Sequence, residues 1–344
     1  MTRLPDPLAR ALRRAAAGEP LSESESYEAF SWILDGGAGE VPTASLLTAL
    51  QLRGETAAEL RGALRAIRDR MIRFETGEGP HLDTCGTGGD GGGTVNISTA
   101  AAIVAAACGY RLVKHGNRAA SSPSGSSDVL AALGIETDVE PEVQARCLKE
   151  LGIAFLFAPR YHPGLRGVAV VRRQLPFRTL FNLLGPLCNP ATPGHQLIGV
   201  PDRPRSRLLA ETLAAEPTIR RAVVVTGSDG LDEVTLGGAT SFWVVEDGTI
   251  TEGMWTPEDF GLSPVQRDAL RVSGAEESAR RIRAAFQGEA GPVRDIILAN
   301  AAAAIWTVEP MPLREAVGRA AQAIDSAAVD RLLERWQDLS RRGA

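Results

Sequence analysis

The sequence predicts an α/β protein in two parts: a small N-terminal all-helical domain, and a larger α/β domain with a mostly parallel central sheet and helices on both faces. Three observations lead to this fold class. Residues 8 to about 72 repeat apolar side chains at three-and-four spacing and contain no strand candidate. From about position 80, short apolar runs alternate with helical stretches. A chain of 344 residues has room for one large domain or two smaller ones.

The helical domain is placed at residues 1–72, with a contribution from about 173–192, and the α/β domain at 78–344. Ser22 or Ser24 is suited to cap the second helix, because a serine hydroxyl can accept a free N–H of the first turn. We expect this domain to serve packing or assembly. Its four expected helical segments are "PLARALRRAAAG", "LSESESYEAFSWILDGG", "VPTASLLTALQLRG" and "ETAAELRGALRAIRDRMIRF".

The α/β domain is predicted from apolar runs that suit buried parallel strands joined by right-handed crossovers. The strand candidates are "GPHLDTC", "YRLVKHG", "IAFLFAP", "HQLIGV" and "RAVVVTG", and the helices between them include "STAAAIVAAACG", "SGSSDVLAALG" and "RSRLLAETLAA". The stretch "TSFWVVEDGTI" is expected to be antiparallel, and three late helices follow it. In such sheets, ligands bind at the carboxyl ends of the strands.

The composition bounds the function classes. The chain has 37 Lys and Arg against 42 Asp and Glu, a net charge of −5, which gives no electrostatic reason to expect a nucleic-acid or membrane-surface partner. Its four cysteines contain no CxxC and do not cluster with the histidines, so neither a disulfide scaffold nor structural zinc is indicated. The N-terminus lacks an apolar signal core, and no apolar run approaches the ~18 residues of a membrane span. We expect a soluble, cytoplasmic protein.

The stretch "DTCGTGGDGGGTVNIST" has six glycines among the eight residues from Gly86 to Gly93. Such a loop is entropically costly, but it leaves backbone N–H groups free to close around a ligand. A flexible linker is the alternative. An apolar segment enters the loop and a helix leaves it, which favours a phosphate clasp at a helix N-terminus. Asn96, Ser98 and Thr99 begin that helix, with Ser98 as the expected N-cap; capping alone would also account for Asn96 and Ser98.

A second polar cluster follows the next strand. Lys114, Asn117 and Arg118 precede the serine-rich run from Ser121 to Ser127, which leads into another helix. A solvated charged face is the alternative, but cations directly after an apolar strand are an expected phosphate-binding arrangement.

Adjacent carboxylates at Asp232 and Glu233 follow a later strand. Neighbouring acids in a turn are most often surface residues, yet beside two anion sites they offer hard oxygen ligands for Mg²⁺. The combination indicates a substrate with two separate phosphate groups and a metal. A nucleoside triphosphate is one option, but the chain has no G-x-x-x-x-G-K-[ST] motif. A phosphorylated sugar that carries a pyrophosphate fits better.

The stretch "FAPRYHPGLRGVAVVRRQLPFRTLFNLLGPLCNPA" places His162 and Arg172 among apolar residues. An arginine in such surroundings suits a planar carboxylate through a bidentate contact. For Arg173 and Arg178 we favour a bracing role for the helical domain.

Seven strings in order, over nearly the whole chain, resemble the anthranilate phosphoribosyltransferase family, which shares its fold with pyrimidine nucleoside phosphorylases. The strings are "GTGGDG" with "NIST", "KHGNR", "SGSSDVLAALG", "FAPRYHP", "RTLFNLLGPLCNPA", "DGLDE" and "NAAAA". The resemblance implies transfer of phosphoribose from phosphoribosyl pyrophosphate to the amine of anthranilate, with release of pyrophosphate, in tryptophan biosynthesis. It also implies a homodimer built through the helical domain.

The resemblance carries site residues over by motif. Phosphoribosyl pyrophosphate would be held by Gly86, Gly89, Asp90, Thr94, Asn96, Ser98, Thr99, Lys114, Asn117, Arg118, Ser122 and Ser126. Ser98, Asp232 and Glu233 would hold Mg²⁺, as two ions. Anthranilate would meet Gly86, His115, Asn117, His162, Arg172 and Gly185. No acid or base is assigned, because an aniline-type nitrogen is already a usable nucleophile.

The chain departs from the family pattern at four positions. Pro176 stands where glycine is usual, Pro123 where lysine is frequent, Ser127 where alanine is common, and Val170 where proline is frequent. Val170 and Pro176 flank Arg172, so a same-fold phosphoribosyltransferase with another aromatic acceptor is one alternative. A non-catalytic nucleic-acid-binding paralogue is another, but it would call for eroded magnesium acids and a basic surface, whereas "DGLDE" is complete.

Overall fold

The computed structural model describes residues 6–89, 91, 93–119 and 124–342. The chain divides into two compact units, each described here by itself. A helical unit comprises Met1–Arg73 and Ala158–Pro190, and an α/β unit comprises Phe74–Phe157 and Ala191–Ala344. The second segment of the helical unit therefore begins at Ala158, whereas the sequence placed that contribution at about 173–192.

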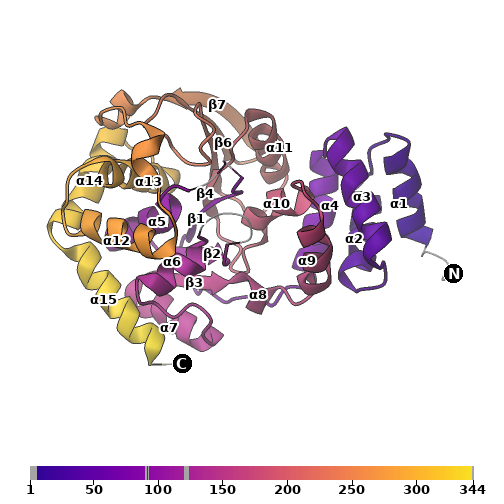
Figure 1. The fold of residues 1–344 in the computed structure, drawn as a ribbon, viewed down its shortest axis with the longest axis horizontal. Coiled ribbons are helices and arrows are strands. Elements are labelled where there is room, and N and C mark those ends of the chain that lie inside the picture. Colours follow the sequence, from indigo (N-terminus) through magenta and orange to yellow (C-terminus); the bar gives the residue numbers. More distant parts are fainter. Residues whose placement is uncertain (1–5, 90, 92, 120–123, 343–344) are drawn as a thin grey trace. The chain divides into compact units, whose positions relative to one another are not determined.

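The helical unit contains the four N-terminal helices that the apolar spacing predicted (Figure 1). Their buried side chains include Leu8, Phe30, Leu46 and Leu60, which form the core of the unit. The helices of the unit are α1 (Asp6–Ala16), α2 (Glu23–Leu34), α3 (Glu40–Arg53), α4 (Ala57–Arg68), α8 (Ala158–Tyr161), α9 (Leu165–Gln174) and α10 (Leu180–Leu184), with the 3₁₀ turn η1 (Gly185–Cys188) after them.

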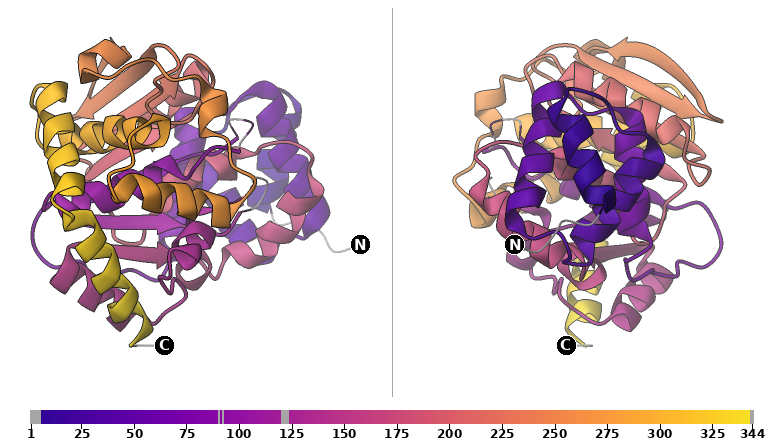
Figure 2. Two further views of the ribbon diagram at one scale, coloured as in Figure 1. Left: turned by 60° about the vertical axis from the view of Figure 1, so that its left-hand side comes forward. Right: turned by 90° about the vertical axis from the view of Figure 1, so that its right-hand side faces the viewer.

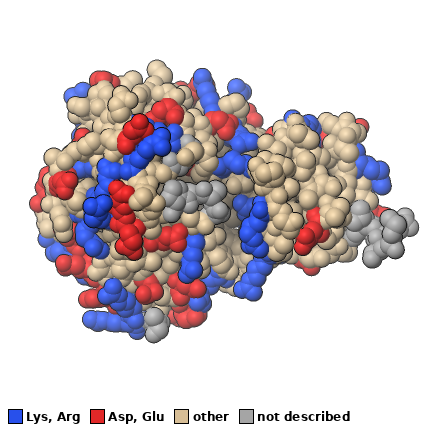
Figure 3. Space-filling view, in the orientation of Figure 1, with Lys and Arg blue, Asp and Glu red and all other residues tan. Residues whose placement is uncertain are grey.

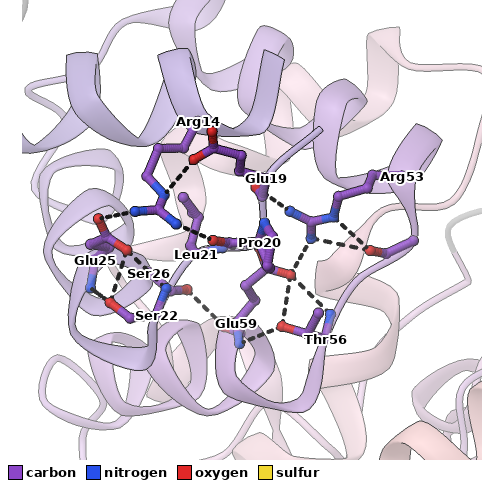
Figure 4. A network of polar contacts seen from close by, with 11 residues as sticks. Arg14, Glu19, Pro20, Leu21, Ser22, Glu25, Ser26, Arg53, Thr56 and Glu59 are labelled. Atoms are coloured by element: carbon purple, nitrogen blue, oxygen red, sulfur yellow. Dashed lines mark hydrogen bonds and ion pairs between the residues drawn. The ribbon is translucent and has the colours of Figure 1, made fainter. Parts of the chain in front are cut away.

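Ser22, rather than Ser24, caps α2, because its hydroxyl accepts the N–H of Glu25 at 3.2 Å and the Glu25 carboxylate accepts the N–H of Ser22 at 2.9 Å. A second capping box joins Thr56 to Glu59 at the start of α4. Glu59 is fully buried, and its carboxylate accepts the N–H of Leu21 at 2.8 Å and pairs with Arg53 (Figure 4). The buried charge is thus satisfied on both oxygens.

The α/β unit is built on one seven-stranded sheet in the order β3-β2-β1-β4-β5-β6-β7. The first five strands pair in parallel, and β6 and β7 continue the sheet as an antiparallel hairpin at one edge (Figure 2). The strands are β1 (Leu82–Gly86), β2 (Leu112–Gly116), β3 (Ile153–Phe157), β4 (His195–Gly199), β5 (Arg221–Gly227), β6 (Thr240–Glu246) and β7 (Thr249–Trp255). The predicted parallel strands and the antiparallel stretch are confirmed.

Strands β6 and β7 are joined by a two-residue turn. Asp247 and Gly248 connect β6 to β7 and both have positive φ, at 49° and 73°. A two-residue Asp-Gly loop with this backbone matches the right-handed twist of the flanking strands.

Helices surround the sheet. Helices α5 and α13 pack on each other and against β1 and β4, while α11 packs against β5 and β6 (Figure 1). All residues of β5 are buried, as expected for a central strand that is covered on both faces. The helices of the unit are α5 (Ile97–Ala107), α6 (Ser126–Ala132), α7 (Pro141–Leu151), α11 (Arg203–Ala214), α12 (Ala275–Phe286), α13 (Pro292–Val308), α14 (Leu313–Asp325) and α15 (Ala328–Arg341), with the 3₁₀ turns η2 (Pro257–Phe260) and η3 (Arg267–Leu270).

The prediction of three late helices is wrong, since the described residues after η3 form four. Helices α14 and α15 are hard to separate in the sequence, because neither glycine nor proline lies between them. The break falls at Ala327, which adopts a left-handed φ of 56°. A non-glycine residue in that region gives no compositional signal.

No single helix among the described residues is long and apolar enough to cross a membrane. Helices α13 and α14 meet the length and composition of a span only as a pair, across a bend of 116°, and α13 is a buried core helix of the α/β unit.

Candidate active site at the carboxyl ends of the parallel strands

A cavity of about 260 Å³ lies at the carboxyl ends of β1 and β2 in the α/β unit. Strand order reverses beside β1, because the chain adds β2 and β3 on one side of it and β4 and β5 on the other. Such a switch point leaves a crevice outside the strand ends, where ligands of open α/β sheets bind. The cavity lining includes these predicted site residues: Gly86, Thr94, Asn96, Ser98, Thr99, Lys114, His115, Asn117, Ser126, Asp232 and Glu233.

Four of the residues predicted to hold phosphoribosyl pyrophosphate stand apart from that group. Gly89 and Arg118 are described and exposed but do not line the cavity. Asp90 and Ser122 lie outside the described residues, as does the departure at Pro123.

The glycines after β1 meet two different physical demands. Gly88, Gly89, Gly91 and Gly93 all have positive φ, between 68° and 88°, where a side chain would be strained. Gly86 has an ordinary φ, but a Cβ there would lie 2.3 Å from Oδ2 of Asp232. That carboxylate also accepts the N–H of Gly88 at 2.7 Å. The start of the loop is therefore held against the Asp232 carboxylate.

Helix α5 begins two residues earlier than an N-cap at Ser98 would place it. Asn96 is the N-cap residue and Ile97 opens the helix, so the prediction of Ser98 as N-cap is wrong. The Asn96 side chain makes no capping hydrogen bond; its Oδ1 instead accepts the hydroxyls of Ser124 and Ser278. Ser98 lies in the first turn of α5, and its N–H donates to Oε1 of Glu233 at 3.1 Å.

The two acids and one lysine form the charged centre of the cavity. Lys114 is 3% exposed; its ammonium donates to the carbonyl of Thr84 and to the hydroxyl of Ser98 at 3.4 Å. Burial of the carboxyl group, and then the neighbouring Asp232 carboxylate, raise the pKa of Glu233, while Lys114 acts in the opposite direction. A cation bound by both carboxylates would offset the repulsion between them and favour the charged form of Glu233.

The donor set fits Mg²⁺. Carboxylate and hydroxyl oxygens of Asp232, Glu233 and Ser98 line the same cavity. Mg²⁺ prefers such hard oxygens and is usually held by one or two carboxylates, together with waters and substrate phosphates. Among the residues that the structure describes, no group of three or more His, Cys, Asp or Glu side chains is placed to bind a metal ion.

The loop after β2 is bonded to the start of α6. The carbonyl of Asn117 accepts the N–H of Ser127 at 3.2 Å and the hydroxyl of Ser126 at 3.4 Å. A Cβ on Gly116 would lie 2.1 Å from that hydroxyl, so the strand end must be glycine for the loop to approach. The Arg118 guanidinium lies 5.7 Å from the centre of the Phe157 ring.

The residues predicted to meet anthranilate occur in both units. Gly86, His115 and Asn117 belong to the α/β unit, as described above, whereas His162, Arg172 and Gly185 belong to the helical unit. Within the helical unit, burial lowers the pKa of His162 to about 4, which makes this histidine neutral at neutral pH. Burial, and then Arg178, lower the pKa of Arg172, whose guanidinium lies 5.8 Å from the centre of the Phe181 ring.

Sequence reasoning missed two residues that shape the cavity. A Cβ on Gly199, at the end of β4, would lie 1.6 Å from the carbonyl oxygen of Asp232. Asn300 is fully buried in α13, accepts the N–H of Val234 at 2.9 Å and donates to the Val234 carbonyl at 2.9 Å. It thereby fixes the chain directly after the two acids. The signal for Asn300 was one amide in the apolar run "IILANAAAAI".

The comparisons with known proteins agree with this architecture. Residues 9–71 match the family model described as "Glycosyl transferase family, helical bundle domain". Residues 78–329 match the one described as "Glycosyl transferase family, a/b domain". The anthranilate phosphoribosyltransferase of Rubrobacter xylanophilus is 48% identical over 337 residues, which cover 97% of this chain and 98% of the relative.

Two solved structures are similar over nearly their whole lengths. The anthranilate phosphoribosyltransferase of Thermus thermophilus has a TM-score of 0.88 at 41% identity, covering 96% of this chain and 99% of that one. The enzyme of Saccharomyces cerevisiae, in complex with PRPP and Mg, has a TM-score of 0.89 at 27% identity, covering 97% of this chain and 98% of that one. The chain belongs to the anthranilate phosphoribosyltransferase family.

Proposed function

We propose that this protein transfers the phosphoribosyl group of phosphoribosyl pyrophosphate to the amine of anthranilate, giving N-(5-phosphoribosyl)anthranilate and pyrophosphate in tryptophan biosynthesis. One observation carries the proposal. A single cavity joins a glycine-rich loop, the start of a helix, a buried lysine and two adjacent acids. These are the parts that a substrate with a pyrophosphate, a second phosphate and a metal ion requires.

The phosphate half of the site would be held by the residues after β1 and β2. The glycine-rich loop brings backbone without side chains to the cavity through Gly86, Gly88 and Gly93, and Lys114 brings a positive charge to it. The proposed contacts are Gly86, Gly89, Asp90, Thr94, Asn96, Ser98, Thr99, Lys114, Asn117, Arg118, Ser122 and Ser126, of which Asp90 and Ser122 lie outside the described residues.

Asp232, Glu233 and Ser98 would hold Mg²⁺, which we propose to be two ions. When bound, the metal would neutralise charge on the pyrophosphate as it leaves. Lys114 acts on the same charge, because its ammonium lies in the cavity. Since hydrogen bonds to Thr84 and Ser98 hold that ammonium before the substrate arrives, it needs little reorganisation during the reaction.

Bond breaking at ribose C1 leaves positive charge on the sugar, and the anthranilate nitrogen then forms the new bond to C1 and releases one proton to solvent. The amine is already a usable nucleophile, so the protein's task is to position it, and no acid or base is assigned. We propose that Arg172 takes the anthranilate carboxylate, since a guanidinium can bind a carboxylate with two parallel hydrogen bonds. Gly86, His115, Asn117, His162 and Gly185 complete the proposed acceptor contacts.

The residues on either side of Arg172 depart from the family pattern, so the identity of the acceptor is the part of the proposal to test. Val170 lies in α9 with Arg172, and Pro176 follows the end of that helix. A same-fold phosphoribosyltransferase with another aromatic acceptor would keep the phosphate half of the site and differ in this segment.

The proposal includes a cytoplasmic homodimer built through the helical domain. Three large apolar side chains support this assembly: Trp32 on α2 is 43% exposed, and Val41 and Leu52 on α3 are 77% and 83% exposed. All three belong to the helical unit, the part through which the dimer is proposed. On the face of the molecule shown in Figure 3, basic and acidic side chains are interspersed, which gives no support to a nucleic-acid-binding role.

The fluorescence of anthranilate tests the proposed function. The protein, phosphoribosyl pyrophosphate and Mg²⁺ are mixed with anthranilate, and the fluorescence should fall only when all components are present. A constant signal, with phosphoribosyl pyrophosphate still bound in a calorimetric titration, would assign the Val170–Pro176 segment to a different acceptor.

A further inference from the structure

Three segments far apart in the sequence meet at the Asn96 side chain. Its Oδ1 accepts a hydrogen bond from the hydroxyl of Ser124 at 2.9 Å and another from the hydroxyl of Ser278 at 3.1 Å. The N–H of Asn96 in turn donates to the Ser278 hydroxyl at 3.0 Å. Ser124 belongs to the loop after β2, and Ser278 lies near the start of α12. Asn96 thus links both phosphate-binding loops to a helix that the sequence did not connect with the site.

Ser278 is fully buried, and its hydroxyl both donates to Asn96 and accepts from it. A serine inside a helix usually turns its hydroxyl to a carbonyl of its own preceding turn or to solvent. Burying a hydroxyl costs free energy unless it is hydrogen-bonded, and here the whole compensation comes from one residue of the site. The two hydrogen bonds between Ser278 and Asn96 therefore hold the Asn96 side chain and backbone in place.

Arg281 links helix α12 to the end of the glycine-rich loop a second time, through the segment from Ala269 to Arg271. The Arg281 guanidinium donates to the carbonyl of Arg271 at 2.7 Å and to that of Ala269. The adjacent Leu270 carbonyl accepts the N–H of Val95 at 2.9 Å. Residues just before Asn96 are therefore fixed to the same helix that holds Asn96 itself, so α12 sets the position of the whole end of the loop.

The two hydroxyls also decide which way the Asn96 amide points. Because both bond to Oδ1, the Nδ2 hydrogens remain as donors, and Asn96 lines the cavity. We infer that Ser278 is a positioning residue for the phosphate site: it holds Asn96 with its amide hydrogens available to an anionic ligand. The inference rests on the proposed function, since the ligand meant is phosphoribosyl pyrophosphate with Mg²⁺.

The test compares Ser278→Ala with Ser340→Ala, a matched control. Ser340 is also a fully buried helical serine, and its hydroxyl accepts the N–H of Glu136 at 3.1 Å and donates to the Gln337 carbonyl at 3.0 Å, away from the cavity. Both changes should lower the urea midpoint of unfolding to a similar extent. Only Ser278→Ala should raise the KM for phosphoribosyl pyrophosphate, by about tenfold, while the KM for anthranilate stays the same. Ser278→Cys nearly keeps the side-chain volume and should raise the KM for phosphoribosyl pyrophosphate as alanine does. This variant replaces Ser278→Ala in the test if the alanine variant does not fold.

A double-mutant cycle shows whether Ser278 acts through Asn96. In an Asn96→Ala background, Ser278→Ala should change the Kd for phosphoribosyl pyrophosphate and Mg²⁺ by less than about twofold. A tenfold effect that persists in that background would overturn the inference, as would a KM no more altered than in Ser340→Ala. Calorimetry distinguishes failure of the proposed function from failure of the inference about Ser278. If the unmodified protein does not bind phosphoribosyl pyrophosphate, the proposed function is wrong. If both Ser278 variants bind it normally, only the role of Ser278 is wrong.

Discussion

The two ends of the parallel strands in the α/β unit carry different residues. At the carboxyl ends, glycines, hydroxyls, Lys114 and the two acids surround a cavity. At the amino ends, His81 and His195 are buried, and Nε of Arg111 donates to Nε2 of His81 at 3.2 Å. At the first edge, two buried carboxyl groups lie where a cationic ligand would stabilise them. At the second edge, the hydrogen bond from Arg111 to His81 joins two side chains of the protein itself. Function and stability are thus separated along the same strands.

The largest expected effect comes from the two acids at the carboxyl edge. Asp232→Asn with Glu233→Gln should lower Mg²⁺-dependent turnover on the order of a thousandfold, because the groups that hold the metal are removed. The thermal midpoint should not fall, since burial already disfavours the charge on Glu233. Steady-state kinetics and a thermal melt of the same variant check both statements; turnover within twofold of the original protein would remove the metal assignment.

Gly86→Ala should have the next largest effect. The new Cβ would lie 2.3 Å from Oδ2 of Asp232, so the carboxylate must shift, and a misplacement of about 1 Å can cost roughly a hundredfold in rate. Gly318→Ala is the matched control, because Gly318 lies inside α14 with open space at its Cβ position. That control should keep full activity and gain roughly 0.5–1 kcal/mol of stability. Equal kinetics for the two variants would contradict the close-approach argument.

At the amino edge, Arg221→Met should reduce stability and leave turnover unchanged. The Arg221 guanidinium lies 4.2 Å from the centre of the Trp306 ring and donates to the Trp306 carbonyl at 3.4 Å. Methionine keeps the apolar stem but loses the cation–π contact, so the free energy of unfolding should fall by about 1 kcal/mol. Urea denaturation measures this; a change in the KM of either substrate would show that the edges are not separate.

The pH dependence of stability should come partly from the amino edge. Burial, and then Arg111, lower the pKa of His81; burial, and then Arg220 and Arg221, lower that of His195. The folded protein therefore binds these protons less well than the unfolded chain does. Their contribution is fully present above the unfolded value of about 6.5 and is lost as the pH falls below it. Urea unfolding from about pH 7.5 to 5.5 should show a decline, and His195→Gln should make it shallower. An unchanged slope in that variant would exclude His195 as a source.

The sequence was sufficient for features that depend on local pattern. The apolar runs predicted the parallel strands, and the glycine-rich stretch and the Asp232–Glu233 pair were placed at strand ends, where the cavity lies. What could not be predicted depends on contacts between distant segments. Gly86 must be glycine because the Asp232 carboxylate, 146 positions later in the chain, occupies the space of a Cβ. Ser278 belongs to a helix whose composition gives no reason to orient a hydroxyl toward the site, and the partner of Asn300, Val234, lies 66 positions earlier in the chain. The start of α5 at Ile97 was missed because Asn96 and Ser98 are both common capping residues, and the hydroxyls of Ser124 and Ser278 decide what Asn96 does.

The most direct test of the central claim is a calorimetric titration of phosphoribosyl pyrophosphate into the protein, with and without Mg²⁺. The claim is that the cavity at the carboxyl ends of β1 and β2 is the phosphate and metal site. We predict that binding is strengthened by Mg²⁺, and that the dependence on Mg²⁺ disappears in the variant that combines Asp232→Asn with Glu233→Gln. Binding with the same Mg²⁺ dependence in that variant would contradict the claim and place the site elsewhere.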